Sequence, residues 1–244
     1  MNDFFGKQYG NKLQADNAQD LIYKLSKVNT NVPGRLDGRT SSDRERYCIV
    51  LYLIQLANNG LLEYPISIEK SESPDIILQY ESDLTIGIEH SDIGNEKTQA
   101  DATALEQFDK KAILVDSVDE NGEIVPIMSS IDNGISSEGI EGDIYERSWV
   151  KFLSEGIKKK NVLLNKSHFK QLNLYWLILY DLTGIIVLNI DKALKIFKDN
   201  VNRGQDWEEL PRQFSMISVM SDNNIFYDIM RDTRIFNLSD KEGV

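Results

Sequence analysis

The hydrophobic period of the chain changes after residue 60, and this change restricts the fold more than any other feature of the sequence. Apolar residues from Ser42 to Asn58 recur at helical spacing, whereas 64–68, 75–80 and 84–91 have the short apolar pattern of strands. The residues Glu81-Ser82-Asp83 join the second strand to the third as a hairpin. A helix followed by a three-stranded meander predicts a sheet that needs helices to cover it.

More helices and strands are expected along the rest of the chain. Helices are predicted over 15–28, 99–107, 147–165 and 191–200, and strands over 175–179, 184–190, 214–220, 224–230 and 234–238. Residues 1–14 are expected to be irregular, Asn121-Gly122 to form a hairpin turn within 112–125, and 129–141 to form a long loop. The sequence therefore predicts an α/β fold in which helices flank a mixed central sheet. Residues 1–40 form an N-terminal helical extension of a domain over 41–244, which ends in a β-rich C-terminal tail.

Composition excludes several classes of protein. The single cysteine, Cys48, excludes a disulfide framework and a cysteine-rich zinc site, and two histidines make a multi-histidine metal site a poor explanation. No segment has the pattern of a secretory leader or is apolar over a length that spans a bilayer, so we expect a cytoplasmic protein without a membrane partner. The net charge of −12 argues against coating nucleic acid through bulk charge, although a local basic groove stays open.

The helix that begins at Ser42 starts with Ser42-Asp43-Arg44-Glu45, which matches the capping box. In this motif a Ser side chain and a Glu three residues later satisfy free amides at the start of the helix. Helix capping is sufficient to explain the presence of Glu45 at this position. A catalytic or metal-binding role for Glu45 stays open as the alternative.

Two carboxylates are predicted to converge on the hairpin. Pro74 cannot donate to a strand ladder and marks a strand start, so Asp75 is the first strand residue. On the next strand side chains alternate, and Glu89 shares a face with Gly87 and Ser91, where it could lie near Asp75. Paired carboxylates repel unless a cation lies between them, and hard oxygen ligands suit Mg²⁺ or Mn²⁺. Taken alone, Asp75 could be a turn residue and Glu89 a solvated edge position.

These residues also carry a family resemblance. Pro74-Asp75, followed on the next strand by Ile86-Gly87-Ile88-Glu89 and then Ser91, resembles the PD-(D/E)xK nuclease superfamily, which has the restriction-endonuclease-like fold. This residue pattern is similar to that of the divergent branch in which the acidic-x-Lys triplet ends in a small hydroxyl residue. The order helix, meander, helix, strand extends the resemblance from Ser42 to Tyr180. It implies that the metal ligands are Asp75, Glu89 and the backbone carbonyl of His90.

The superfamily's lysine would stand at position 91, where this chain has Ser91. A lysine there stabilises the negative charge of the transition state, so an active enzyme needs a replacement cation. In superfamily members with a migrated lysine, a helix equivalent to 147–165 donates it, and Lys160 lies in the middle of the apolar stripe of that helix. Lys158 is the reserve candidate and Lys97 a weaker one, whereas snorkelling of Lys160 into water is the structural alternative.

The resemblance implies metal-dependent phosphodiester hydrolysis, with DNA as the favoured substrate and Mg²⁺ or Mn²⁺ as cofactor. Asp75 and Glu89 would hold the metal, Lys160 would stabilise the developing charge, and Glu45 would bind the metal or a water. Nucleic acid would contact a basic strip formed by Lys158, Lys159, Lys160, Lys166, His168 and Lys170.

Other functions stay open beside this one. The main alternative is a catalytically inactive protein of the same nuclease fold that acts as a binding or assembly module, which Ser91 and the acidic net charge both favour. An RNA or small-molecule phosphodiesterase would use the same chemistry. The sequence also leaves a monomer and a homodimer open.

Overall fold

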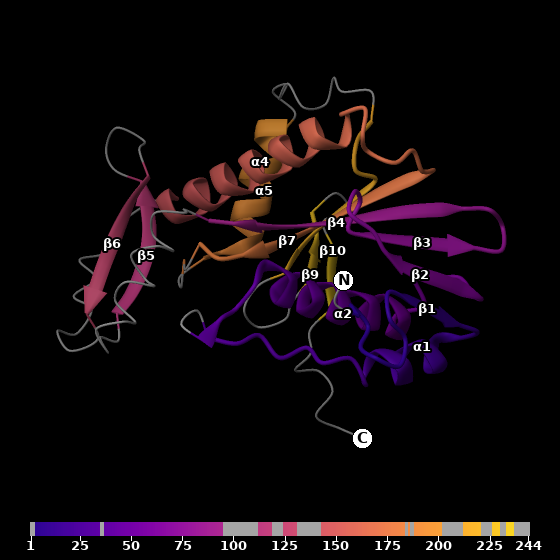
Figure 1. Ribbon diagram of the computed structural model, residues 1–244. Helices are drawn as coiled ribbons and strands as arrows, with labels where there is room; N and C mark the ends of the chain where they lie inside the picture. The colour runs from indigo at the N-terminus through magenta and orange to yellow at the C-terminus, as the bar shows by residue number, and fades with distance from the viewer. Residues whose placement is uncertain are drawn as a thin grey trace.

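In the described part of the chain, eight strands form one mixed sheet through the middle of the molecule (Figure 1). The structure is a computed structural model and describes residues 3–34, 37–94, 112–118, 124–130, 143–183, 185, 188–201, 212–220, 226–229 and 233–236. In spatial order the strands are β1 (Lys12–Ala15), β2 (Ile66–Lys70), β3 (Ile76–Tyr80), β4 (Thr85–Ile93), β7 (Leu174–Asp181), β8 (Met216–Met220), β9 (Phe226–Asp228) and β10 (Thr233–Phe236). Strands β4, β7 and β8 pair in parallel, and the other neighbours pair antiparallel.

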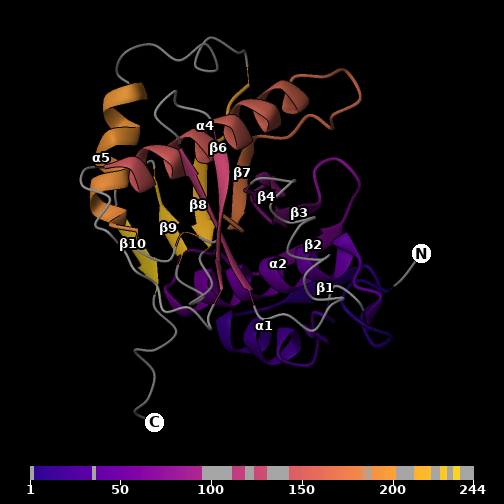
Figure 2. The ribbon, with the colours of Figure 1, turned by 90° about the vertical axis from the view of Figure 1, so that its left-hand side faces the viewer.

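Helices cover both faces of this sheet (Figures 1 and 2). Helices α1 (Ala18–Leu25) and α2 (Ser41–Asn58) lie on one face, and α4 (Ile144–Leu164) and α5 (Ile190–Val201) lie on the other. Each layer has its own hydrophobic cluster, and alternation along β4 sends Ile86 and Ile88 into the α2 cluster but Ile93 into the α4 cluster. The predicted mixed sheet flanked by helices is therefore confirmed.

A second sheet has two strands, β5 (Ala112–Val118) and β6 (Ile124–Ser130), and lies beyond the N-terminal end of α4 (Figure 1). The strands pair antiparallel from Ala112↔Ser130 to Val118↔Ile124, which agrees with a hairpin in this region. The predicted Asn121-Gly122 turn, the helix over 99–107 and Lys97 lie outside the described residues, as does most of the loop predicted over 129–141.

The start of the chain contains a strand where the sequence predicts irregular structure. Residues Lys12–Ala15 form β1 at the sheet edge and pair with Ile66–Glu69 of β2. Leu13 and Ala15 are buried, and they share a hydrophobic cluster with both α1 and α2. Four residues are too few for an alternating pattern to stand out in the sequence. The first 40 residues thus add a strand to the main sheet, while the predicted boundary at residue 40 stays a prediction.

The strand predicted over 184–190 is wrong for the described residues of that segment. Ile185 and Leu188 pack against the α4 cluster outside any strand, and Ile190 begins α5. The sheet position beside β7 belongs to β8, which pairs with Trp176–Tyr180. An apolar run of this length can form a strand of the sheet or can pack against the sheet outside any strand. Its hydrophobic period alone does not distinguish these two arrangements. The strands predicted in the tail are present in shorter form as β8, β9 and β10, and they extend the main sheet.

Helix α2 has a different N-cap from the predicted one. Thr40 is the cap: its Oγ1 accepts the N–H of Asp43 at 3.3 Å, and Asp43 Oδ2 accepts the N–H of Thr40 at 2.8 Å. The prediction of a Ser42–Glu45 capping box is wrong because this pair, two residues upstream, satisfies the free amides first. Glu45 is therefore available for contacts outside the helix.

Gly87 of β4 has no room for a side chain. A Cβ at this position would lie 2.6 Å from Pro74 Cγ and 2.9 Å from Leu172 Cδ1. Because both neighbours are packed, we expect Gly87→Ala to lower the free energy of unfolding by about 1–3 kcal/mol, measured by urea denaturation. Ser91→Ala, on the same strand and face, is the control and should change it by less than about 0.5 kcal/mol. Equal stability of the two variants would contradict this packing.

Candidate functional site

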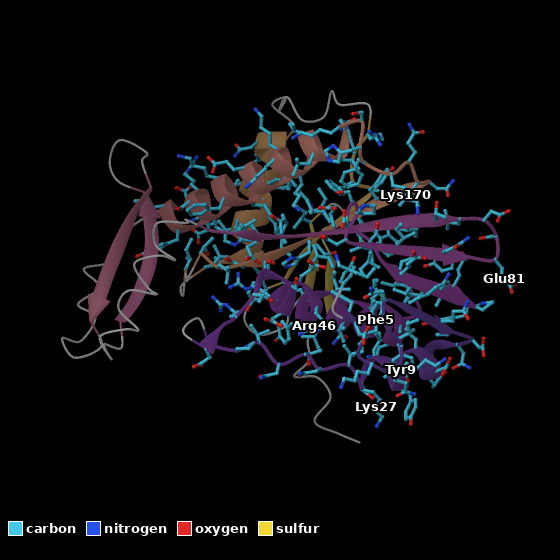
Figure 3. The ribbon with its side chains drawn as sticks, viewed as in Figure 1. Phe5, Tyr9, Lys27, Arg46, Glu81 and Lys170 are labelled. Carbon is cyan, nitrogen blue, oxygen red and sulfur yellow. The ribbon has the colours of Figure 1, made fainter. Side chains whose placement is uncertain are left out.

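The carboxylates of Asp75 and Glu89 lie on one face of the β3–β4 hairpin. The register pairs Ile76 with Ile88 and Ile77 with Gly87, so Asp75, directly before β3, stands opposite Glu89. Asp75 Oδ2 accepts the backbone N–H of His90 at 2.8 Å. The Asp75 side chain thus takes the place of the next ladder bond, at the point where β3 begins. In Figure 3, Glu81 marks the turn at the other end of this hairpin.

Lys160 reaches this pair from helix α4. Its Nζ lies 2.7 Å from Glu89 Oε2, and the two side chains are 16% and 7% exposed. Lys158 and Lys159 are exposed on the outer side of the helix, while Ile157 one turn earlier is buried. The apolar stripe of α4 therefore turns Lys160 toward the sheet, where its ammonium meets a carboxylate and does not snorkel into water.

Glu45 approaches Asp75 from the opposite helical layer, through Lys70. Lys70 Nζ lies 2.7 Å from Glu45 Oε1 on α2 and 3.6 Å from Asp75 Oδ1. The same ammonium lies 5.5 Å from the centroid of the Phe4 ring. Lys70 is not among the residues predicted for the site, although alternation along β2 places it on the same side as the buried Ile66 and Ile68. A lysine at an inward position of a strand is the signal that could have identified it.

Burial and mutual repulsion raise the proton affinity of the carboxylates. The pKa of Glu89 is raised from 4.5 to about 7, first by burial and then by the charge of Asp75, and Lys160 opposes this shift. The pKa of Glu45 is also raised, by burial and by Asp75, with Lys70 acting against it. The positive charges of Lys70 and Lys160 thus do not fully offset burial and the repulsion among the three carboxylates. Binding of an additional cation would therefore be favourable at this site.

His90 contributes its backbone to the site and its ring to the core. In an extended strand the N–H and C=O of one residue point to the same neighbour, so the His90 carbonyl is directed toward the Asp75 side of β4. Burial, and after it the positive charges of Lys160, Arg44 and Lys70, lower the pKa of the imidazole to about 3. The ring is therefore neutral at physiological pH and is no acid or base.

The donor set fits a hard divalent cation that keeps part of its hydration shell. Within the described residues no three Asp, Glu, His or Cys side chains come close enough to form a metal cluster on their own. Mg²⁺, however, is commonly bound by one or two carboxylates, with waters completing its octahedron. Asp75 and Glu89 supply two carboxylates, and the carbonyl of His90 supplies a third oxygen. Asp75 and Glu89 repel each other in the absence of a cation, which is the electrostatic condition that favours binding one.

The raised pKa of Glu89 predicts a stability that falls with pH. Because the folded state binds this proton more tightly than the unfolded state, the free energy of unfolding should decrease as pH rises from 4.5 to about 7. The decrease should be on the order of 1–3 kcal/mol, and Glu89→Gln should abolish it. Urea denaturation at pH 5 and pH 7.5 measures the effect. Glu69→Gln, at an exposed carboxylate of β2, is the control, and a pH dependence equal in native protein and Glu89→Gln would refute the assignment.

Most of the predicted basic strip is exposed next to the start of β3. Lys158, Lys159, Lys166, His168 and Lys170 are exposed along the end of α4 and the segment after it, whereas Lys160 has turned inward. The backbone N–H of Lys170, labelled in Figure 3, donates to the carbonyl of Ser73 at 3.3 Å. The strip therefore leads to the residues that directly precede Asp75.

The predicted site residues thus come together from three places in the fold: Glu45 from α2, Asp75 and Glu89 from the hairpin, and Lys160 from α4. No helix in the described part of the chain is both long and apolar enough to cross a membrane. Comparisons of the chain with known protein families, with curated proteins and with solved structures find no match.

Proposed function

We propose that the protein is a metal-dependent phosphodiesterase that cleaves DNA, on a fold of the restriction-endonuclease-like kind. The observation that carries the proposal is the convergence of Asp75 and Glu89 on adjacent strands, with Lys160 Nζ 2.7 Å from Glu89. Two carboxylates and a lysine ammonium on one sheet face are the groups that the PD-(D/E)xK chemistry needs. The lysine comes from α4 because Ser91 occupies its usual place in that pattern.

Each residue of the site then has a defined task. Asp75, Glu89 and the His90 carbonyl would hold Mg²⁺ or Mn²⁺, which when bound polarises the phosphate and lowers the pKa of a water. Lys160 places a positive charge where the phosphoryl oxygens gain negative charge in the transition state. Lys70 ties Asp75 to Glu45 and fixes the orientation of the first carboxylate. Glu45, whose pKa is raised, is placed to accept a proton from a water beside Asp75.

The exposed cations of the basic strip support DNA as the substrate. In a chain with a net charge of −12, they form a local patch that can contact the phosphates of a strand. The patch ends beside Ser73, so a strand bound along it would be led to the carboxylates.

One observation favours the alternative, a binding module without catalysis. Lys70 and Lys160 already form ion pairs with Glu45 and Glu89, each at 2.7 Å, so the site is partly neutralised from within. A protein that retained this fold for binding alone would keep such pairs for stability.

Metal-dependent stability and cleavage test the proposal together. Thermal unfolding with Mn²⁺ at 100 times its Kd should show about 2.7 kcal/mol of stabilisation, and plasmid DNA should be cut under the same conditions. The double variant Asp75→Asn with Glu89→Gln should lose both effects. A metal-dependent shift without cleavage would favour the binding module, and no shift in the native protein would remove the metal site.

A further inference from the structure

A cavity lies beside the carboxylates on the α2 side of the sheet. Its volume is about 380 Å³, and among the described residues its lining includes Arg39, Arg44, Tyr47 and Tyr180 and no acidic residue. This lining is unusual for a chain of net charge −12. A second cavity, of about 440 Å³, shows the contrast, because its lining has Lys12 together with Asp16, Glu81 and Asp83.

The guanidinium of Arg44 is held at the wall of the first cavity. It forms an ion pair with Asp92, and it lies 5.7 Å from the centroid of the Tyr180 ring. Arg39 acts on the same carboxylate, since the charges of Arg44 and Arg39 both oppose the rise in the pKa of Asp92 that burial causes. The described lining therefore carries two guanidinium groups, and Arg44 is the one that forms an ion pair with Asp92. A guanidinium has five N–H donors, so Arg44 can donate to an anion in the cavity as well as to Asp92.

The cavity and the carboxylates are close neighbours. Arg44 and Glu45 are consecutive residues of α2, and Asp92 belongs to the same strand as Glu89. His90 links the two places, because its ring Nε2 lies 3.7 Å from Asp92 Oδ1 and its backbone N–H donates to Asp75 Oδ2 at 2.8 Å. A ligand in the cavity would thus be next to the site of the proposed reaction.

We propose that this cavity binds one nucleotide unit, with its phosphate on Arg39 and Arg44 and its base against the rings of Tyr47 and Tyr180. Guanidinium groups match the geometry of phosphate oxygens, and bases stack on aromatic side chains whatever their sequence. The volume lies in the lower part of the range for small-ligand pockets, which suits a single nucleotide. The inference rests on the proposed function only in assigning this nucleotide to the strand that is cut.

Binding without cleavage tests the inference. A fluorescent single-stranded hexanucleotide is titrated with protein in EDTA, and its anisotropy gives the Kd. Arg39→Ala should weaken binding about tenfold or more and lower the salt slope of log K by about 0.7, the value for one phosphate contact on a single strand. Tyr47→Leu should weaken binding by about 5–100-fold through lost stacking. Lys12→Ala, which removes a cation from the second cavity, is the matched control and should leave the Kd unchanged.

Competition identifies the ligand unit. Deoxyadenosine monophosphate should displace the hexanucleotide from this cavity better than inorganic phosphate or deoxyadenosine, because it alone offers both charge and base. If it binds the native protein directly but the hexanucleotide does not, the ligand is a free nucleotide and its place in a strand is refuted. Arg44→Ala is avoided because Arg44 is buried, and circular dichroism checks that Arg39→Ala is folded.

The outcomes separate this inference from the proposed function. The variant Asp75→Asn with Glu89→Gln should bind the hexanucleotide as the native protein does, since neither residue lines the cavity. Arg39-dependent binding without any cleavage would refute the nuclease and keep the nucleotide pocket. Binding that is equal in native protein and Arg39→Ala, or absent from both for every probe, would overturn the pocket.

Discussion

Replacing Lys160 with alanine should lower DNA cleavage by about 10²–10³-fold, the usual effect of deleting one group that stabilises charge in the transition state. The ammonium lies 2.7 Å from Glu89 Oε2, and Ser91 leaves the usual lysine position without a cation. Metal binding should persist, because lysine is not a ligand and a divalent cation beside Glu89 itself favours the ionised carboxylate. Cleavage rates and Mn²⁺-dependent thermal shifts at pH 8 measure the two properties separately.

Two further variants make this result specific. Lys159→Ala, on the exposed side of the same helix, should leave cleavage nearly unchanged. Ser91 shares its strand face with Glu89, so Ser91→Lys should partly restore activity to Lys160→Ala if both positions reach the same phosphate. Equal activity in native protein and Lys160→Ala would reject the role of Lys160 and leave the two carboxylates in place.

Replacing Trp149 with alanine should lower the free energy of unfolding by about 3–5 kcal/mol. Trp149 belongs to α4, is completely buried and is among the largest buried side chains. Its Nε1 donates to Asp181 Oδ2 at 2.7 Å, which joins the helix to the end of β7. The variant therefore leaves a cavity and removes a partner from Asp181. Guanidinium denaturation, with the midpoint and the slope both fitted, gives the change.

Trp149→Phe separates packing from the hydrogen bond. It keeps most of the apolar contact and should cost about 1–3 kcal/mol, the range for removing one hydrogen-bond partner. Tyr23→Ala, at an exposed aromatic residue of α1, should change stability by less than about 0.5 kcal/mol. A loss below 1 kcal/mol in Trp149→Ala would show that α4 is held to the sheet by other contacts.

Periodic segments of the sequence predicted their elements well, and short or ambiguous ones did not. Helices α2 and α4 and strands β3, β4 and β7 match the predicted segments to within a few residues because each is long or strongly patterned. Strand β1 has four residues and gains its form only from pairing with β2. The strand predicted over 184–190 is wrong for its described residues, because a segment that packs against α4 and a buried strand both need apolar side chains.

The candidate site could be predicted only where local geometry decides the direction of a side chain. Alternation on a hairpin places Asp75 beside Glu89, and the helical stripe places Lys160 toward them. The contacts of Lys70 and Arg44 depend on how β2 and α2 pack in three dimensions, and no local pattern contains that information. Thr40 and Ser42 both begin a capping pattern, and only the one at Thr40 forms. A capping role predicted for Glu45 gave no reason to expect its ion pair with Lys70.

The parallel pairing of β4 with β7 joins Ile86 to Leu174, residues that are far apart in the chain and are therefore made at different times during synthesis. A chain leaving the ribosome presents Glu45, Lys70 and the hairpin carboxylates long before α4 and β7 have been made. Glu89 meets the ammonium of Lys160 only when α4 docks, so a chain that ends before α4 lacks this partner of Glu89. The proposed chemistry would therefore begin only after the central strands of the sheet have paired, and truncated translation products would carry none of it.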